Sequence, residues 1–163
     1  MNRSPWPSDR PKTGEILVEI AYGRQVTVKY EMNRALSPED FVDVLERSGL
    51  AERRPTGDLT TMRGMVENTN LIVTAWDGDL LVGVARSMTD FHYACYLSDL
   101  AVDRAFQKQS IGRVLLRLTT DKLGPQCKLI LVSAPAANDY YSALRFEKNE
   151  RTWVLPRGKQ IDS

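Results

Sequence analysis

The chain has 163 residues, of which 42% are apolar and 26% charged, and its formal net charge is +1. This length fits about one domain, and the composition is that of an ordinary globular protein. A charge this small gives no general attraction to nucleic acids or acidic membranes, so we expect neither as a partner.

The N-terminal end predicts a cytoplasmic protein. Residues 1–14 carry three prolines and lack the apolar region of a signal peptide, so we interpret them as a flexible arm that precedes a single domain over residues 15–163. No apolar run in the chain approaches the roughly 20 residues that span a bilayer. Cys95, Cys127 and the single His92 lack the spacing of metal ligands, so we predict no metal and interpret both cysteines as buried free thiols.

The first half of the chain predicts two strands and two helices. The run at residues 15–22 allows an added strand, and residues 26–31 alternate as expected for the first core strand. A helix begins after Ser37, the predicted N-cap, and places Phe41, Val44 and Leu45 inward. Residues 51–57 form a charged turn, and Asp58 is the predicted cap of a second helix.

The second half is richer in strands. Residues 71–76 and 80–88 flank an Asp-Gly turn and predict a hairpin, and residues 93–102 form the next strand. They are followed by a helix at 111–122, a strand at 128–133, a helix at 136–144 and a closing strand at 152–155. Hairpins followed by a strand-helix-strand crossover predict a mixed α/β sheet flanked by helices.

The segment LSDLAVDRAFQKQSIGRVLLRL, residues 97–118, runs from an apolar strand through a polar turn into an amphipathic helix. The first amides of that helix lack intrahelical partners, and the positive end of the helix dipole lies beside them. Gly112 admits a ligand close to the backbone, while Lys108 and Arg113 add positive charge. This pattern favours a phosphate site, although a plain surface turn with Ser110 as N-cap remains open.

VDRAFQKQSIGRVLL resembles the acyl-CoA-binding segment of the GCN5-related N-acetyltransferase (GNAT) superfamily, whose signature is Gln/Arg-x-x-Gly-x-Gly/Ala. Gln107, Ser110 and Gly112 fall on its three fixed positions, with Ser110 where glycine is usual. ANDYYSALRFEKN is similar to the family's Tyr-x-x-x-Gly-Phe segment, with Tyr141 matching and Arg145 where glycine is usual. The resemblance extends over residues 26–155.

This resemblance implies an acyl-CoA N-acyltransferase fold and an enzyme that uses acetyl-CoA as co-substrate. It implies that backbone groups of the strand hold the pantetheine arm and that the turn holds the pyrophosphate. Ala134 stands where many members have an asparagine that contacts the cofactor, and Asn138 follows one helical turn later. The expected cofactor-binding residues are Leu100, Ala101, Val102, Gln107, Lys108, Gln109, Ser110, Ile111, Gly112, Arg113, Asn138 and Tyr141.

The chemistry requires positioning and proton management, because a thioester is already activated toward an amine. The resemblance implies that Tyr141 protonates the leaving thiolate, whereas the structural alternative makes Tyr140 and Tyr141 core aromatics. Asp99 is the candidate acceptor of the amine proton. The alternatives are Glu67 and a water relay among Tyr93, Tyr96 and Ser98, and a purely structural ion pair is the other interpretation of Asp99. Strand alternation places Asp99 on one face together with Leu97.

The sequence leaves the acceptor open. An acidic pocket would favour polyamines or aminoglycosides, a basic one acidic amino acids, and an open groove a protein amino group. We expect a small primary amine on family prevalence. The alternative to an enzyme is a non-catalytic module that binds acyl-CoA. The sequence does not decide whether the protein forms a homodimer. A nucleotide cradle is disfavoured, because GxxxxGK[ST] is absent and no GxGxxG follows the first strand.

Overall fold

The computed structural model describes residues 15–19, 23 and 25–161. The predicted arm at residues 1–14 lies outside them. By its contacts the chain divides into two units, Met1–Leu131 and Val132–Ser163. Among the described residues, the first unit holds the sheet and three α-helices, and the second holds one short α-helix and the C-terminal segment.

One mixed sheet of six strands, in chain order, organises the first unit. Neighbouring strands are antiparallel except the last pair, which is parallel, so the predicted mixed α/β architecture is confirmed. The possible added strand forms as the first strand of the sheet. The strands are β1 (Glu15–Glu19), β2 (Gln25–Met32), β3 (Leu71–Asp77), β4 (Leu80–Thr89), β5 (Ala94–Val102) and β6 (Lys128–Leu131).

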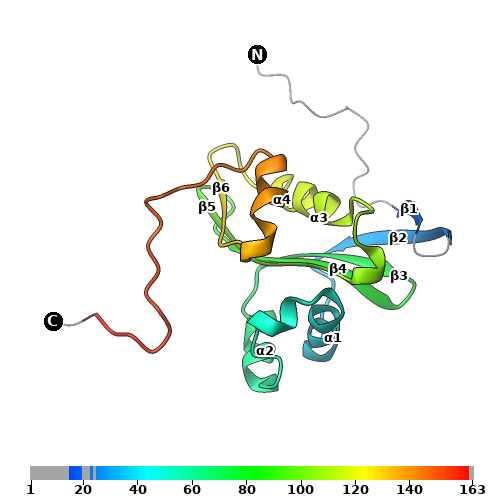
Figure 1. Cartoon of the computed structure of the whole chain (residues 1–163), viewed down its shortest axis with the longest axis horizontal. Coiled ribbons are helices and arrows are strands. Elements are labelled where there is room, and N and C mark those ends of the chain that lie inside the picture. The colour runs from blue at the N-terminus through cyan, green and yellow to red at the C-terminus, as the bar shows by residue number, and fades with distance from the viewer. Residues whose placement is uncertain (1–14, 20–22, 24, 162–163) are drawn as a thin grey trace, which may run out of the picture. The chain divides into compact units, whose positions relative to one another are not determined.

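Two capped helices pack on one face of this sheet (Figure 1). Helix α1 (Pro38–Ser48) begins where the Asp40 amide donates to Ser37 Oγ at 3.0 Å, and it buries Phe41, Val44 and Leu45 as predicted. The 3₁₀ helix η2 (Leu50–Arg53) occupies the predicted charged turn. Helix α2 (Leu59–Glu67) follows Asp58, which accepts from the Thr61 amide.

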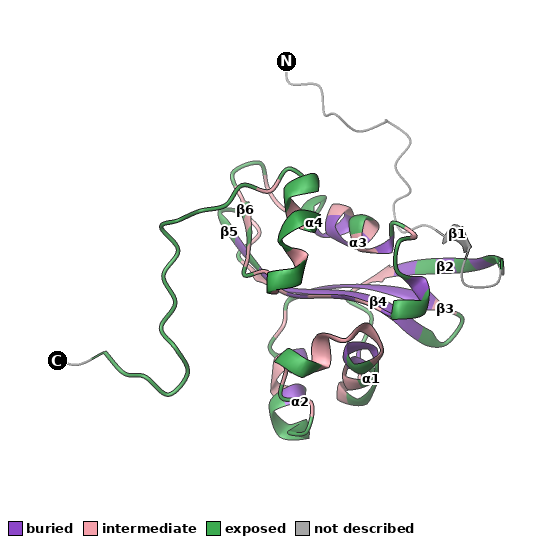
Figure 2. Ribbon diagram, viewed as in Figure 1, coloured by how far each residue is buried: buried purple, intermediate pink, exposed green. Residues whose placement is uncertain are grey.

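Helix α3 (Ile111–Thr120) covers the opposite face (Figure 1). Six consecutive residues of β3, from 71 to 76, are buried because both faces of this central strand are covered (Figure 2). Gly83 of β4 lets α3 approach closely, since a Cβ there would lie 3.1 Å from Leu115 Cδ1 and 3.2 Å from Ile111 Cγ2. None of the described helices has the length and apolar content that a membrane span requires.

The second unit contains the 3₁₀ helix η4 (Pro135–Ala137) and helix α4 (Asn138–Ala143). The predicted closing strand at residues 152–155 is wrong, because the segment has no strand conformation and pairs with none of the described strands. Its side chains face solvent, with Trp153 90% exposed. Apolar, β-branched composition produces a strand only where a partner strand and a covered face exist, and this segment has neither (Figure 2).

Candidate functional site

Strand β5 departs from regular geometry at Ser98. Asp99 lies opposite Arg86 of β4, whereas Leu97 lies opposite Ser87, so Ser98 is an extra residue that forms a β-bulge. Since Arg86 and Ser87 are consecutive in β4, they face opposite sides of the sheet. Leu97 and Asp99 therefore lie on opposite faces, and their predicted placement on one face is wrong.

The last part of β5 has an unpaired edge. Pairing with β6 ends at Leu97 opposite Leu131, and no described residue continues that pairing along residues 98–102. The Asp103 amide donates to the Val82 carbonyl of β4 at 2.9 Å. Backbone groups alternate in direction along an antiparallel strand, so those of Leu100 and Val102 point away from β4. The backbone of Ala101 lies on the β4 side, and its side chain is buried in the core.

The turn after β5 presents backbone amides. The 3₁₀ helix η3 (Arg104–Phe106) leads into it, and Lys108 and Ser110 both have φ of +63°. Ser110 occupies the N-cap position of α3, but its side chain makes no capping hydrogen bond. The amides of residues 108–113 donate to no acceptor within the described chain, and consecutive free amides of this kind bind anions.

Side chains complete this anion cradle. Lys108 and Arg113 are exposed and add positive charge at the turn. Gln107 Nε2 donates to the Val102 carbonyl at 2.9 Å and so links the turn to the open edge of β5. Ile111 has a free amide, while its side chain is buried under the helix. Leu100, Val102 and the turn thus lie along one edge of the first unit, whereas the predicted residue Ala101 faces β4 and the core.

A charged pair fixes the start of the turn. The Asp103 carboxylate accepts from Arg47 Nη1 of α1 and from the Ala105 amide of η3. Arg47 Nη2 also donates to the Leu81 carbonyl of β4 at 2.6 Å. These bonds connect α1, β4 and the end of β5, so they hold the beginning of the cradle in place.

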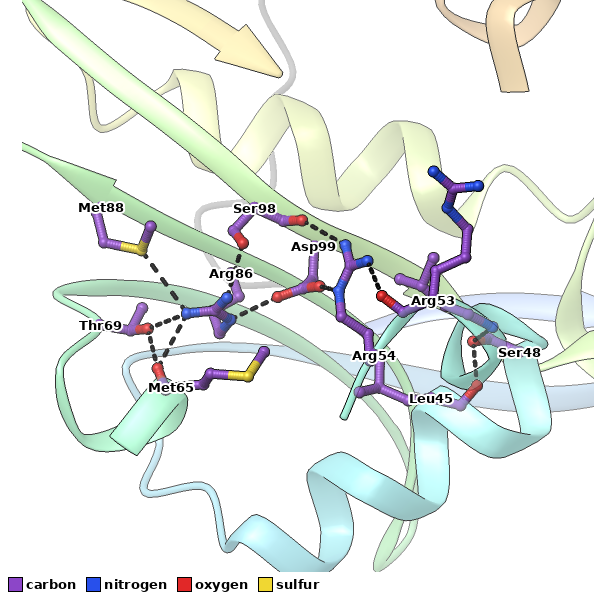
Figure 3. A network of polar contacts seen from close by, with 11 residues as sticks. Leu45, Ser48, Arg53, Arg54, Met65, Thr69, Arg86, Met88, Ser98 and Asp99 are labelled. Carbon is purple, nitrogen blue, oxygen red and sulfur yellow. Dashed lines mark hydrogen bonds and ion pairs between the residues drawn. The ribbon is translucent and has the colours of Figure 1, made fainter. Parts of the chain in front are cut away.

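Asp99, the residue directly after the bulge, lies within a buried ionic network (Figure 3). Its carboxylate accepts from Arg54 Nε at 2.5 Å and from Arg86 Nε at 2.6 Å. Arg54 Nη2 donates to the Ser98 carbonyl at 2.9 Å, and Arg86 Nη2 donates to Ser98 Oγ at 2.7 Å. Arg86 Nη1 donates further to Met65 and Thr69, so both arginines tie the helical layer to β5.

This network bears on the prediction that Asp99 accepts the amine proton. Asp99 is 1% exposed, and each of its oxygens already accepts from a guanidinium group. Because this carboxylate is buried, an amine in solvent does not meet it directly. The alternative acceptor Glu67 lies exposed at the end of α2, and Tyr93 and Tyr96 are 68% and 40% exposed.

The predicted residues of α4 belong to the second unit. Tyr141 makes edge contacts with the rings of Tyr140 and Phe146, with centroids 5.3 and 5.4 Å away. Burial raises the pKa of Tyr141 to about 12, and the nearby Tyr140 adds to the rise, so the hydroxyl stays protonated at neutral pH. Asn138 Oδ1 accepts from Ser133 Oγ at 2.6 Å.

Sequence reasoning did not single out Arg54 and Arg86. A signal for Arg86 was available, because it interrupts the apolar strand pattern LLVGVARSM and a buried arginine requires an acidic partner. The hairpin register that brings it opposite Asp99 could not be counted from the sequence, since the bulge shifts that register by one residue. The sequence did not distinguish Arg54 from the other charged residues of the turn at residues 51–57.

Residues 44–154 match the family model described as acetyltransferase (GNAT) domain. No curated protein matches the chain at comparable significance.

Solved structures with the same fold include a GNAT-family acetyltransferase from Streptococcus pneumoniae, which is 18% identical over 78% of this chain and 98% of its own, with a TM-score of 0.62. The aminoglycoside N-acetyltransferase AAC(6')-Iy, solved in complex with CoA, is 16% identical over 83% and 98%, with a TM-score of 0.61. An aminoglycoside acetyltransferase from an uncultured soil metagenomic sample, in complex with trehalose, is 18% identical over 82% and 97%, with a TM-score of 0.56.

Proposed function

We propose that this chain, which belongs to the GNAT acetyltransferase family, transfers the acetyl group of acetyl-CoA to a primary amine of a small molecule in the cytoplasm. The amine attacks directly within a ternary complex. Two of the structural relatives carry names of aminoglycoside acetyltransferases, which supports a small-molecule amine as the acceptor class.

One observation carries this proposal: the free amides of residues 108–113 directly follow a strand with an unpaired edge. The amides suit a pyrophosphate, and the outward backbone groups of Leu100 and Val102 suit the amides of a pantetheine arm, which binds like an added strand. Ser110 has a positive φ, which is the conformation that glycine adopts readily, so the serine takes up a backbone suited to the glycine that is usual at this position.

Acetyl-CoA supplies an activated thioester, and the residues of the chain supply position and proton transfer. The cradle and the strand edge orient the pantetheine arm along β5 toward the bulge at Ser98. Tyr141 donates a proton to the leaving sulfur, and with a pKa of about 12 its hydroxyl carries that proton at neutral pH. Asp99 stays a candidate for a proton relay through water, with Arg54 and Arg86 as the groups that position it.

Isothermal calorimetry with acetyl-CoA tests the proposal, with CoA, ATP and NAD as comparison ligands. We expect binding of acetyl-CoA and CoA alone, and its loss in Gly112→Trp, because an indole beside the amides blocks the pyrophosphate. Gly57→Trp is the matched control, since a Cβ at Gly57 meets nothing within 4 Å. Failure of the wild-type protein to bind acetyl-CoA would refute the proposed function.

A further inference from the structure

We propose that the acceptor amine also carries a carboxylate and that Arg54 binds this carboxylate. The inference rests on the proposed function, because it takes the bulge of β5 as the place where the thioester meets the acceptor. It narrows the acceptor to amino-acid-like molecules.

The position of Arg54 is the first step. Its Nη2 donates to the carbonyl of Ser98, which is the first residue of β5 beyond the pairing with β6. The unpaired stretch of β5 from Ser98 to Val102 covers four residue steps of about 3.3 Å, or about 13 Å, so an arm bound along this edge from the cradle side is directed toward Ser98. Arg54 therefore lies at the reacting end of the arm.

The charge of the network is the second step. Arg54 and Arg86 share the single carboxylate of Asp99, and neither makes another ion pair among the residues that the structure describes. The network thus keeps one positive charge in excess beside the site. Burying such a charge is costly unless an anion accompanies it, so the arrangement favours an acceptor that brings one.

The exposure and the unused N–H groups of the two arginines indicate that Arg54, rather than Arg86, binds the anion. The Arg86 side chain is 5% exposed, and its guanidinium already donates to Asp99, Met65, Thr69 and Ser98. The Arg54 side chain is 20% exposed, and its three nitrogens each donate one hydrogen bond within the protein. A guanidinium has five N–H groups, which leaves two on Arg54 to meet a carboxylate.

This arrangement disfavours polycations. An aminoglycoside or a polyamine would bring further positive charge against Arg54 without compensating it, whereas an amino acid places a carboxylate near its amine. The chain would then differ in acceptor from the relatives that are named aminoglycoside acetyltransferases.

Steady-state acetylation of matched acceptor pairs tests the inference. The panel consists of α- and ω-amino acids with their amides, which keep the amine and lose the carboxylate, together with spermidine and kanamycin. For the best amino acid we expect kcat/KM about 10- to 100-fold above that of its amide. Arg54→Gln should remove most of this ratio, because it raises the KM of the amino acid much more than the KM of its amide.

Arg53→Gln is the matched control, because the exposed Arg53 side chain points away from Asp99 in Figure 3 and only its backbone carbonyl meets Arg54. It should keep the full ratio of acid to amide. Arg54→Lys retains the charge but only three donors, so it should keep part of the ratio, and it serves where Arg54→Gln fails to fold.

Three results overturn the inference: amides acetylated as fast as acids, a preference for spermidine or kanamycin, or an unchanged ratio in the Arg54 variants. A panel without any acetylated amino acid overturns it as well. Calorimetry of acetyl-CoA on the same samples separates these failures from failure of the proposed function, since cofactor binding persists when only the acceptor class is wrong.

Discussion

Ser110 and Arg145 both have a left-handed backbone, with φ of +63° and +67°. These are the two positions at which the resembled family usually has glycine. A side chain in this conformation costs roughly 1–2 kcal/mol, so each residue carries local strain that glycine would relieve. Both residues thus adopt the backbone region that glycine favours, although each carries a side chain.

We predict that Ser110→Gly raises the free energy of unfolding by about 0.5–1 kcal/mol, because relief of strain exceeds the extra entropy of glycine in the unfolded chain. Urea denaturation measures the change. Gln109→Gly is the control, since residue 109 has no positive φ and should lose stability on the same substitution. Equal effects at the two positions would argue against strain at Ser110.

The hydroxyl of Tyr141 gives a prediction about catalysis. Tyr141→Phe should lower kcat by about 100-fold or more while the KM for acetyl-CoA changes little, because the ring stays and only the proton is lost. With a pKa of about 12, the wild-type hydroxyl remains protonated, so kcat should show no alkaline decline from this group between pH 7 and 10. Rate measurements over that range check both statements.

Tyr140→Phe is the companion variant and should retain the wild-type kcat. Tyr140 neighbours Tyr141 on α4 and is 40% exposed. If kcat falls more in Tyr140→Phe than in Tyr141→Phe, then Tyr140 and not Tyr141 is the proton donor.

At the scale of elements, the loop between β4 and β5 depends on one carboxylate. Asp90 Oδ1 accepts from the amides of His92, Tyr93 and Ala94, and these bonds lower its pKa to about 2. A lowered pKa contributes stability that is complete above the unfolded value of about 3.9 and disappears as the pH falls toward 2.

Asp90→Asn should therefore lower the Tm at pH 7, and the difference from wild type should shrink as the pH drops from 5 toward 2. Thermal unfolding at several pH values provides the measurement. A Tm difference that stays constant over this range would contradict the role given to the carboxylate.

The link between α1 and the end of β5 predicts a coupled pair. Arg47→Ala leaves Asp103, which is 7% exposed, without its cationic partner and should cost about 1–3 kcal/mol of unfolding free energy. The double variant with Asp103→Ala should cost less than the sum of the two single variants. Strict additivity in urea denaturation would show that the two side chains do not depend on each other.

Helix caps and turns were predictable because their signals are local. Ser37 and Asp58 accept from amides three residues ahead, and the Asp-Gly pair closes the hairpin between β3 and β4 as predicted. The face of Leu97 was not predictable, because a bulge depends on the pairing of two strands rather than on the alternation within one. The same bulge hid the pairing of Arg86 with Asp99.

At the scale of the whole molecule, the family was predictable from the turn at residues 107–112, and the mixed sheet from the order of strands and helices. The lack of a strand at residues 152–155 was not predictable. The residues TWVL have the composition of a strand, but composition does not show whether a partner strand lies beside them. The cofactor residues and Tyr141 stay predictions until ligand binding and rates are measured.

Amide hydrogen exchange tests the contrast between the paired central strands and the C-terminal segment that lacks strand pairing. We predict slow exchange limited by global unfolding in β3 and β4, whose residues are buried and paired on both sides. Residues 153–158 donate no backbone hydrogen bond within the described chain and should exchange close to the rate of an unstructured peptide. Protection at Trp153 would instead show that a closing strand forms in solution.

The cover of β3 has a consequence for synthesis on the ribosome. The apolar residues of β3 lie on both faces of the sheet, and α3 covers one of these faces. Helix α3 is complete only at Thr120, which is 43 residues after Asp77, the last residue of β3. At about 5–20 residues per second, the emerging chain holds that face uncovered for about 2–9 s. During those seconds the nascent strand is a binding segment for holdase chaperones. We therefore expect chaperone supply to change the yield of folded protein, while the stability of the folded protein stays the same.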